Sequence, residues 1–271
     1  MPTLNFLFWN VNQKNLTPQI VNLAYSKQVD ILILAENPVS DVHLVQALNA
    51  TESLYFLNPS ICKKITIISR FHQDFIIPVS EEHRMTTRRL TLLDMPPLLL
   101  TGLHLPDKSS FGTESQSENA SKVARALAEV EQQEQIEAHV VVGDFNMNPF
   151  ETGMIKANGF HGSMSSEVAQ NQSRTVQGQK YAYFYNPMWS LFGDLNKDAS
   201  GTYYYRQAEP VCYEWNIFDQ VLLRPPLISA FVRESLEIVE KIGVTSLLTR
   251  QKRPNRQGYS DLLPLFFTLK F

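Results

Sequence analysis

Cysteine is scarce in this chain of 271 residues, which contains only Cys62 and Cys212. The two lie far apart and neither belongs to a Cys-x-x-Cys pair, which argues against a disulfide framework and against a cysteine-ligated zinc site. No apolar run reaches the roughly 20 residues that a membrane-spanning helix needs. We expect the first strand to begin by Leu4, which leaves no room for a secretory leader. These absences predict a cytoplasmic protein with reduced cysteines and no membrane partner.

A strong charge of one sign is also lacking. The formal net charge is −3 and the isoelectric point is about 6.1, so no global basic field attracts nucleic acid. A local basic cleft is still compatible with that total. The chain is 44% hydrophobic and long enough to bury a large core. Because no repeat, linker or low-complexity tract interrupts it, we expect one domain spanning residues 1–271 rather than two small ones.

Apolar runs that read as strands alternate in part with segments of helical periodicity. Helices are expected after Thr17, from Ser40 to Leu48, and over about 117–136, where apolar residues form a stripe. Between residues 150 and 215 we expect one short helix and long loops. Strands are expected at 4–9, 30–34, 65–68, 75–77, 90–93, 98–103, 140–142, 217–223, 236–239 and 265–271. Short spacers between 54 and 105 predict antiparallel hairpins. The pattern predicts a mixed α/β (α+β) fold with two packed sheets and flanking helices.

The most informative local motif is Gly143-Asp144-Phe145-Asn146, directly after a buried strand. The glycine allows close backbone approach, and a turn can aim the side chains of Asp144 and Asn146 into one crevice. Hard cations prefer oxygen ligands, and phosphoryl oxygens are stabilised by neutral donors or metals. The motif therefore suits phosphate chemistry, although an ordinary turn that closes a strand would use the same residue types.

Other polar side chains stand at or near the ends of apolar runs, namely Asn10, Glu36, His104, Asp219 and Asp261. A solvated carboxylate or a packed histidine would explain most of them singly. The end of a strand is also the usual ligand crevice of α/β sheets. Asp219 is different because it lies inside an expected strand, where a buried carboxylate needs a partner. A histidine ring is the natural partner, as in base-orienting pairs.

Taken together, these residues and their order resemble the endonuclease/exonuclease/phosphatase (DNase I-like) superfamily. The resemblance runs from Asn10 to the Ser-Asp-x-x-Pro motif that begins at Ser260. The segments 184–189 and 201–205 look like a bacterial branch of that family. The resemblance implies a four-layer sandwich of two mixed β-sheets flanked by helices. It also implies Mg²⁺ or Mn²⁺ as cofactor.

Carried over by position, the resemblance implies a role for each residue. Glu36 would bind the metal ion with Asn10 and Asp261. Asp144 would position or deprotonate the attacking water, Asn146 would hold a phosphate oxygen, and His104 would contact the phosphate or the leaving group. Asp219 would orient a catalytic histidine after Asp261, but Leu262 stands at that position. Substrate contacts are assigned to Asn186, Arg88 and Arg253, although a solvated basic loop would explain such arginines equally well.

The sequence therefore predicts a divalent-metal-dependent phosphodiester hydrolase, a nuclease on DNA or RNA, that is strongly impaired because leucine cannot carry a proton or pair with Asp219. Two alternatives stay open. One is a phosphatase or phosphodiesterase on a small phosphorylated molecule, and the other is an inactive binding module that retains the cleft. No obligate protein partner is expected.

Overall fold

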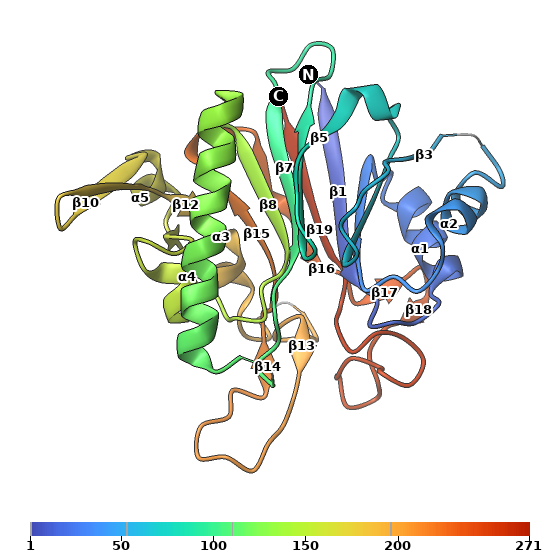
Figure 1. The fold of residues 1–271 in the computed structure, drawn as a ribbon. Coiled ribbons are helices and arrows are strands. Elements are labelled where there is room, and N and C mark those ends of the chain that lie inside the picture. Colours follow the sequence, from blue (N-terminus) through green and yellow to red (C-terminus); the bar gives the residue numbers. More distant parts are fainter. Residues whose placement is uncertain (1, 53, 110, 196) are drawn as a thin grey trace.

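Two large mixed β-sheets pack face to face and carry helices on their outer faces (Figure 1). The computed structural model describes residues 2–52, 54–109, 111–195 and 197–271. The first sheet has six strands in the order β16-β19-β1-β2-β4-β3. Their bounds are β1 (Thr3–Asn10), β2 (Ile31–Ala35), β3 (Phe56–Leu57), β4 (Ile65–Ser69), β16 (Phe231–Ile238) and β19 (Leu265–Lys270).

The second sheet has seven strands in the order β5-β6-β7-β8-β15-β12-β9. Their bounds are β5 (Ile76–Glu81), β6 (Met85–Leu90), β7 (Leu98–His104), β8 (His139–Asp144), β9 (Gly162–Ser163), β12 (Phe184–Tyr185) and β15 (Asp219–Leu223). Pairs β5–β6 and β6–β7 are antiparallel, as the short spacers predicted. Small separate pairs are β10 (Ser173–Val176) with β11 (Gln179–Ala182), β13 (Tyr203–Tyr204) with β14 (Trp215–Asn216), and β17 (Lys241–Ile242) with β18 (Thr245–Ser246).

The helices are distributed over both outer faces. Their bounds are α1 (Thr17–Ser26), α2 (Asp41–Leu48), α3 (Thr113–Glu134), α4 (Thr152–Ile155) and α5 (Ser166–Gln170), with 3-10 turns η1 (Gln73–Phe75), η2 (Pro187–Leu191) and η3 (Pro225–Leu227). Ser40 caps α2 as expected, since its hydroxyl accepts a hydrogen bond from the His43 amide at 3.4 Å. Among the described residues, no helix combines the length and the apolar character that crossing a membrane requires.

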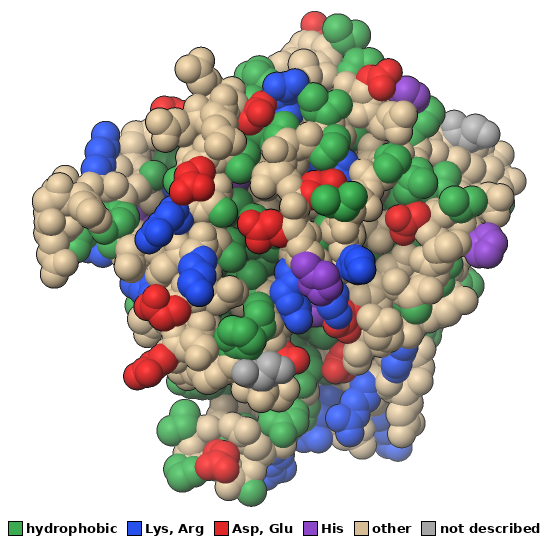
Figure 2. All heavy atoms as spheres, viewed as in Figure 1, with side chains coloured by type: hydrophobic (Ala, Val, Ile, Leu, Met, Phe, Trp, Pro, Cys, Tyr) green, Lys and Arg blue, Asp and Glu red, His purple; other side chains and the backbone are tan. Residues whose placement is uncertain are grey.

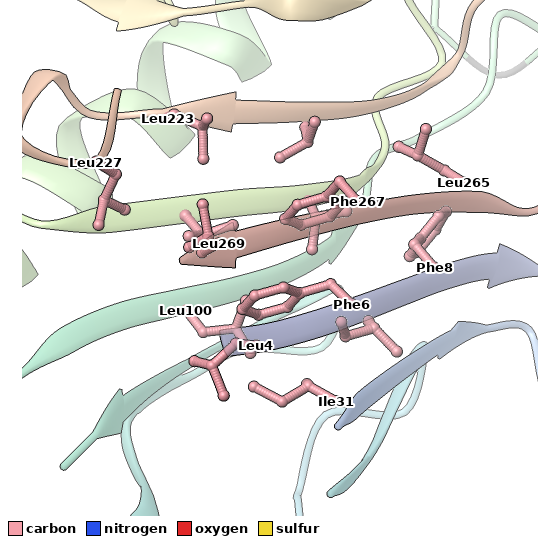
Figure 3. Packing of buried hydrophobic residues seen from close by; sticks show 14 of the residues in the cluster. Leu4, Phe6, Phe8, Ile31, Leu100, Leu223, Leu227, Leu265, Phe267 and Leu269 are labelled. Carbon is pink, nitrogen blue, oxygen red and sulfur yellow. The ribbon is translucent and has the colours of Figure 1, made fainter. Parts of the chain in front are cut away.

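Alternation along β1 explains the layers. Successive side chains of a strand point to opposite faces, so Phe6 and Phe8 enter the core between the sheets while Leu7 and Trp9 face α1 and α2. Figure 3 shows Phe6 beside Phe267 of β19, whose ring stacks on it at a centroid distance of 4.7 Å. On the other side of the molecule, α3 and α4 cover the outer face of the second sheet. The predicted four-layer fold is confirmed.

Strand direction brings the candidate residues to one edge of the sandwich. Parallel strands β1 and β2 end at Asn10 and just before Glu36, and parallel strands β7 and β8 end at His104 and Asp144. Strand β15 runs antiparallel to β8 and begins at Asp219, directly opposite Asp144. Figure 1 shows both chain ends at the opposite end of the sheets from the loop between β13 and β14.

Several expected elements were misplaced. The strand expected at 90–93 is β6, which ends at Leu90 and carries polar residues that hide its identity. These polar side chains are paired inside the protein, as in the hydrogen bond of 2.7 Å between the Thr87 and Thr101 hydroxyls. The region 150–215, expected to hold one short helix, contains α4, α5 and the hairpin β10–β11.

Candidate active site

Seven of the residues singled out in the sequence line one cavity of about 680 Å³ at the end of the two sheets. They come from both sheets and from the loop before β19. They are Asn10, Glu36, His104, Asp144, Asn146, Asp261 and Leu262. Neighbouring strands of each sheet deliver their polar ends to one edge, and residues up to about 250 positions apart in the chain therefore meet there.

The His104 imidazole lies between two carboxylates from different sheets. Its Nδ1 is 3.7 Å from Oε1 of Glu36, and its Nε2 is 3.8 Å from Oδ2 of Asp144. The side chain is buried, and Nδ1 has no hydrogen-bond partner within the described ranges. Glu36 and Asp144 therefore face one small space across a single ring.

Asp144 is held by two hydrogen bonds. Its Oδ2 accepts from Nδ2 of Asn10 at 2.9 Å, and its Oδ1 accepts from the amide of Asn146 at 2.8 Å. Burial raises the pKa of the Asp144 carboxyl above its usual range, against the lowering influence of His104 and of both hydrogen bonds. Gly143 is required before it, since a Cβ there would overlap the carbonyl oxygen of Leu103.

Glu36 and Asn146 both adopt left-handed backbone conformations, with φ of +53° and +51°. This region is uncommon for residues other than glycine, and asparagine tolerates it better than glutamate does. Such conformations cost free energy and cluster at functional sites. Here they turn the chain sharply after β2 and β8 and so aim both side chains at the cavity. The Glu36 carboxylate also pairs with Nζ of Lys64 at 3.3 Å.

The loop before β19 is tied to the end of β1. The Ser260 hydroxyl donates to the Asn10 carbonyl at 2.6 Å, and Nδ2 of Asn12 donates to Oδ1 of Asp261 at 2.8 Å. Burial raises the pKa of the Asp261 carboxyl. Asn12 was missed in the sequence, although it follows Asn10 at the end of an apolar run and its side chain faces the same cavity.

The donor set fits the divalent ion that the resemblance implies. The described residues contain no group of three or more His, Cys, Asp or Glu side chains that could hold a metal ion by themselves. Mg²⁺ needs no such group, since it commonly uses one or two carboxylates and completes its shell with water and substrate phosphate. Glu36, the amide oxygen of Asn10 and Asp261 provide that type of open donor set around one cavity.

Position 262 is fixed by its backbone rather than by its side chain. The Leu262 carbonyl accepts from Nε1 of the buried Trp9 at 2.9 Å, and its amide donates to the Ser260 hydroxyl at 3.1 Å. The neighbouring Leu263 amide donates to the Thr202 carbonyl at 2.9 Å. The leucine side chain itself contributes only an apolar surface to the cavity wall.

Asp219 lies behind this wall and is fully buried. Thr202 connects the two positions, because its hydroxyl accepts from the Asp219 amide at 3.3 Å. Neither carboxylate oxygen of Asp219 meets a well-placed hydrogen-bond donor in the described part of the chain. Burial raises its pKa well above the usual 3.8, and the negative charges of Asp144 and Asp261 add to the effect against the lowering influence of the Thr202 hydroxyl.

The structure does not bring two of the expected substrate contacts, Arg88 and Asn186, to the wall of the cavity. Arg88 is only 1% exposed, and its guanidinium pairs with Glu81 at 2.9 Å and donates to the Pro59 carbonyl at 2.9 Å. Asn186 is fully buried, and its Nδ2 donates to Oε1 of Gln220 at 2.8 Å. Both side chains use their polar groups inside the protein. Arg253 lies over the ring of Tyr204 at 4.3 Å, and its role in substrate binding stays a prediction.

The cavity is instead lined by other cations. Lys64, Arg84 and Lys108 contribute to its wall. Arg84 directly precedes β6, and its Nη1 donates to the His104 carbonyl at 3.4 Å. A correct placement of β6 in the sequence would have pointed to Arg84.

No protein-family model matches this chain, and no curated protein is similar to it in sequence. Solved structures do share its fold. TDP2 from C. elegans aligns with a TM-score of 0.59 and 13% identity, covering 99% of this chain and 75% of that one. An endonuclease/exonuclease/phosphatase family protein from Bacteroides thetaiotaomicron gives 0.57 and 12%, covering 99% and 98%. D. rerio TDP2 in complex with a single strand DNA product gives 0.56 and 13%, covering all of both chains. The resemblance found in the sequence is thus confirmed for the fold.

Proposed function

We propose that this chain is a divalent-metal-dependent phosphodiester hydrolase acting on nucleic acid, with activity strongly reduced by Leu262. One observation carries the proposal: His104 lies within 3.7 Å of the Glu36 carboxylate and 3.8 Å of the Asp144 carboxylate. A carboxylate that can bind a cation, Glu36, and a carboxylate that can act as a base toward water, Asp144, thus flank one site. The DNA product bound to the D. rerio TDP2 structure supports nucleic acid as the substrate class.

Some of these residues would bind the metal ion, and others would bind the phosphate or transfer a proton. Glu36, Asn10 and Asp261 would hold Mg²⁺ or Mn²⁺, which when bound would offset the negative charge that develops on the phosphate. Asp144 orients the attacking water and takes its proton, a role suited to a carboxyl whose pKa burial raises. Nδ2 of Asn146 donates one hydrogen to the Leu105 carbonyl at 2.9 Å and has a second hydrogen that can be donated to a phosphate oxygen.

His104 contacts the phosphate or the leaving oxygen through Nε2. The leaving oxygen needs a proton, which a histidine at position 262 would supply and Leu262 cannot. In this proposal a histidine at position 262 would be the partner of Asp219, whose buried carboxylate oxygens have no well-placed donor among the described residues. A second function follows from the same feature: the chain captures nucleic acid in the cavity without cleaving it.

The decisive experiment restores the missing group. Leu262→His should raise metal-dependent phosphodiester cleavage by at least roughly tenfold, a cautious floor for an acid/base group that typically contributes about 10²–10⁴. Substrates are plasmid, single-stranded DNA, RNA and a small phosphodiester, each with Mg²⁺ or Mn²⁺. Leu262→Gln is the matched control, because it adds polarity without a titratable group. Glu36→Ala in the Leu262→His background should abolish the gain.

An unchanged rate for Leu262→His would reject this account of the lesion and favour capture without cleavage. A gain on the small phosphodiester alone would favour a small phosphorylated substrate. We further propose that residues 1–271 act as one domain in the cytoplasm without an obligate protein partner; residues 1, 53, 110 and 196 of that range lie outside the described residues.

A further inference from the structure

Three aromatic rings form a stack along one wall of the cavity. The Phe218 and Tyr203 rings lie at a centroid distance of 5.3 Å with an interplanar angle of 26°. Tyr203 and Tyr205 follow at 6.4 Å and 12°. All three residues line the cavity. Their exposure rises outward, from 8% for Phe218 to 50% for Tyr205, so the stack runs from the interior to the solvent.

The stack is fixed relative to the reaction centre. Tyr203 pairs with Leu262 as an antiparallel bridge, and β13 pairs with β14 through Tyr203 and Asn216. The Tyr205 amide donates to the Glu214 carbonyl at 2.8 Å, which continues this pairing by one residue. Figure 1 shows the β13–β14 hairpin with its loop extending past the ends of both sheets. A group stacked on Tyr205 therefore has a defined distance from position 262.

Successive side chains of β13 point to opposite faces, and this distinguishes the cavity-facing rings from rings that only fill the core. Tyr203 and Tyr205 share the face of the cavity, whereas the Tyr204 ring packs edge-on against Trp215 and beneath Arg253 on the other face. A packed core has no need of Tyr205, which leaves half of its surface in solvent beside a polar cavity. An exposed aromatic face beside a polar cavity offers a surface on which a base can stack.

One cation of the cavity, Arg84, lies on the other side of the catalytic residues, whereas Lys108 lies over the Phe218 ring at 5.5 Å. In the second sheet, β7 and β8 separate β6 from β15, so His104 and Asp144 lie between Arg84 and the aromatic stack. Lys64 pairs with Glu36, and Lys108 pairs with Glu151. The Arg84 guanidinium donates to the His104 carbonyl at 3.4 Å. Figure 2 shows the mixture of charges on this side of the molecule, with Lys and Arg side chains also gathered at the lower right, over the loop that follows β18.

We propose that the cavity takes a single-stranded nucleic acid, with a base stacked on Tyr205 and a phosphate near Arg84. This inference rests on the proposed function and names the substrate form of the same site. Base–aromatic stacking needs an open base face, which a single strand offers and a paired duplex covers with its neighbours. Tyr205 and Arg84 lie on opposite sides of the catalytic residues. A single strand that contacts both would therefore place one of its phosphodiesters at the catalytic residues.

The test compares three fluorescent probes in anisotropy titrations with Mg²⁺: a single-stranded oligonucleotide, its duplex, and a single strand of stable abasic residues. The single strand should bind more tightly than the duplex. Tyr205→Ala should weaken single-strand binding by roughly tenfold, which corresponds to the loss of one stacked base. Tyr205→Phe should retain the affinity because it keeps the ring. Tyr181→Ala, on the distant hairpin β10–β11, should have no effect.

The abasic strand distinguishes stacking from phosphate binding, since Tyr205→Ala should leave its affinity unchanged. Equal affinity for duplex and single strand, or an unaltered affinity of Tyr205→Ala for the single strand, would overturn the inference. An equal loss with the abasic strand would do the same. Cleavage of the abasic strand by Leu262→His tests the proposed function alone, because that substrate has phosphodiesters and no bases. The two proposals can therefore fail separately.

Discussion

Asp144 and Asp219 lie directly opposite each other on antiparallel strands β8 and β15. Both are buried, and the pKa of each carboxyl is raised, first by burial. Asp144 has Asn10 and the Asn146 amide as donors, whereas the Asp219 oxygens have no well-placed donor among the described residues. Two buried carboxylates so close together favour retention of a proton on one of them. We expect Asp219, which has fewer donors, to be the one that keeps it.

Asp219→Asn should therefore change how stability depends on pH. Folded Asp219 has a pKa raised well above 3.8, the value for the unfolded chain, so its favourable contribution is fully present below 3.8. That contribution is lost as the pH rises through the folded pKa, and the loss is about 1.4 kcal/mol for each pH unit that separates the unfolded from the folded pKa. The advantage of Asp219→Asn over the parent in free energy of unfolding should grow with pH.

Urea unfolding of both proteins from about pH 4 to about pH 8 measures this difference, with all other titrating groups cancelling. Leu262→His provides the matched comparison, since a ring that donates to Asp219 should lower its pKa and flatten the pH dependence. A constant difference between Asp219→Asn and the parent over the whole range would mean that Asp219 titrates normally.

Arg88→Met should destabilise the protein without affecting nucleic-acid binding. The change leaves the Glu81 carboxylate without the guanidinium that now pairs with it at 2.9 Å, and loss of one partner of a buried ion pair costs about 3–5 kcal/mol. Arg89→Met is the control, because its pair with Glu134 at 2.7 Å is 39% exposed at the arginine and should contribute at most about 1 kcal/mol. Urea unfolding and oligonucleotide titration give both quantities. Weakened binding by folded Arg88→Met would restore it as a substrate contact.

Several expected site residues that the structure brings to one cavity stand at the ends of unmistakable strands. Asn10, Glu36 and Asp144 each follow a continuous apolar run, and parallel neighbours must end at the same edge. The family pattern added His104 and Asp261, which no local periodicity would have linked to them. The same apolar runs form the central strands of the two sheets, which is why the fold was predictable.

The sequence is less informative where polar residues obscure a strand, and where long-range strand pairing decides which side chains face the cavity. Strand β6 carries threonines and an arginine, Arg88, that are satisfied inside the protein, so the apolar pattern places this strand several residues too late and does not single out Arg84. The aromatic stack depends on which face of β13 meets the cavity, and that follows from the pairing of Tyr203 with Leu262 and Asn216. Short-range sequence patterns do not contain this long-range information.

Arg84→Gln should weaken nucleic-acid binding uniformly across sequences. If its guanidinium neutralises one phosphate, the slope of log Kd against log salt concentration should fall in magnitude by about 0.7 for a single strand. Arg89→Gln is the control, since its charge is paired with Glu134 and it does not line the cavity. Titrations at several salt concentrations measure the slope. The same slope for Arg84→Gln and the parent would remove this residue from the phosphate path.

Glu36→Gln should weaken binding of the divalent ion in the chain as it stands, with Leu262 unchanged. Affinity for hard cations follows the charge of their oxygen ligands, and Glu36 is the acidic residue at the end of β2 that faces His104 in the cavity. We expect at least a roughly tenfold higher Kd for Mn²⁺, measured by the loss of its free-ion electron paramagnetic resonance signal. Glu137→Gln, which lies just before β8 and away from this cavity, should bind as the parent does. Equal Mn²⁺ affinity of Glu36→Gln and the parent would show that the ion is held elsewhere, because the readout involves no catalysis and is independent of the lesion at position 262.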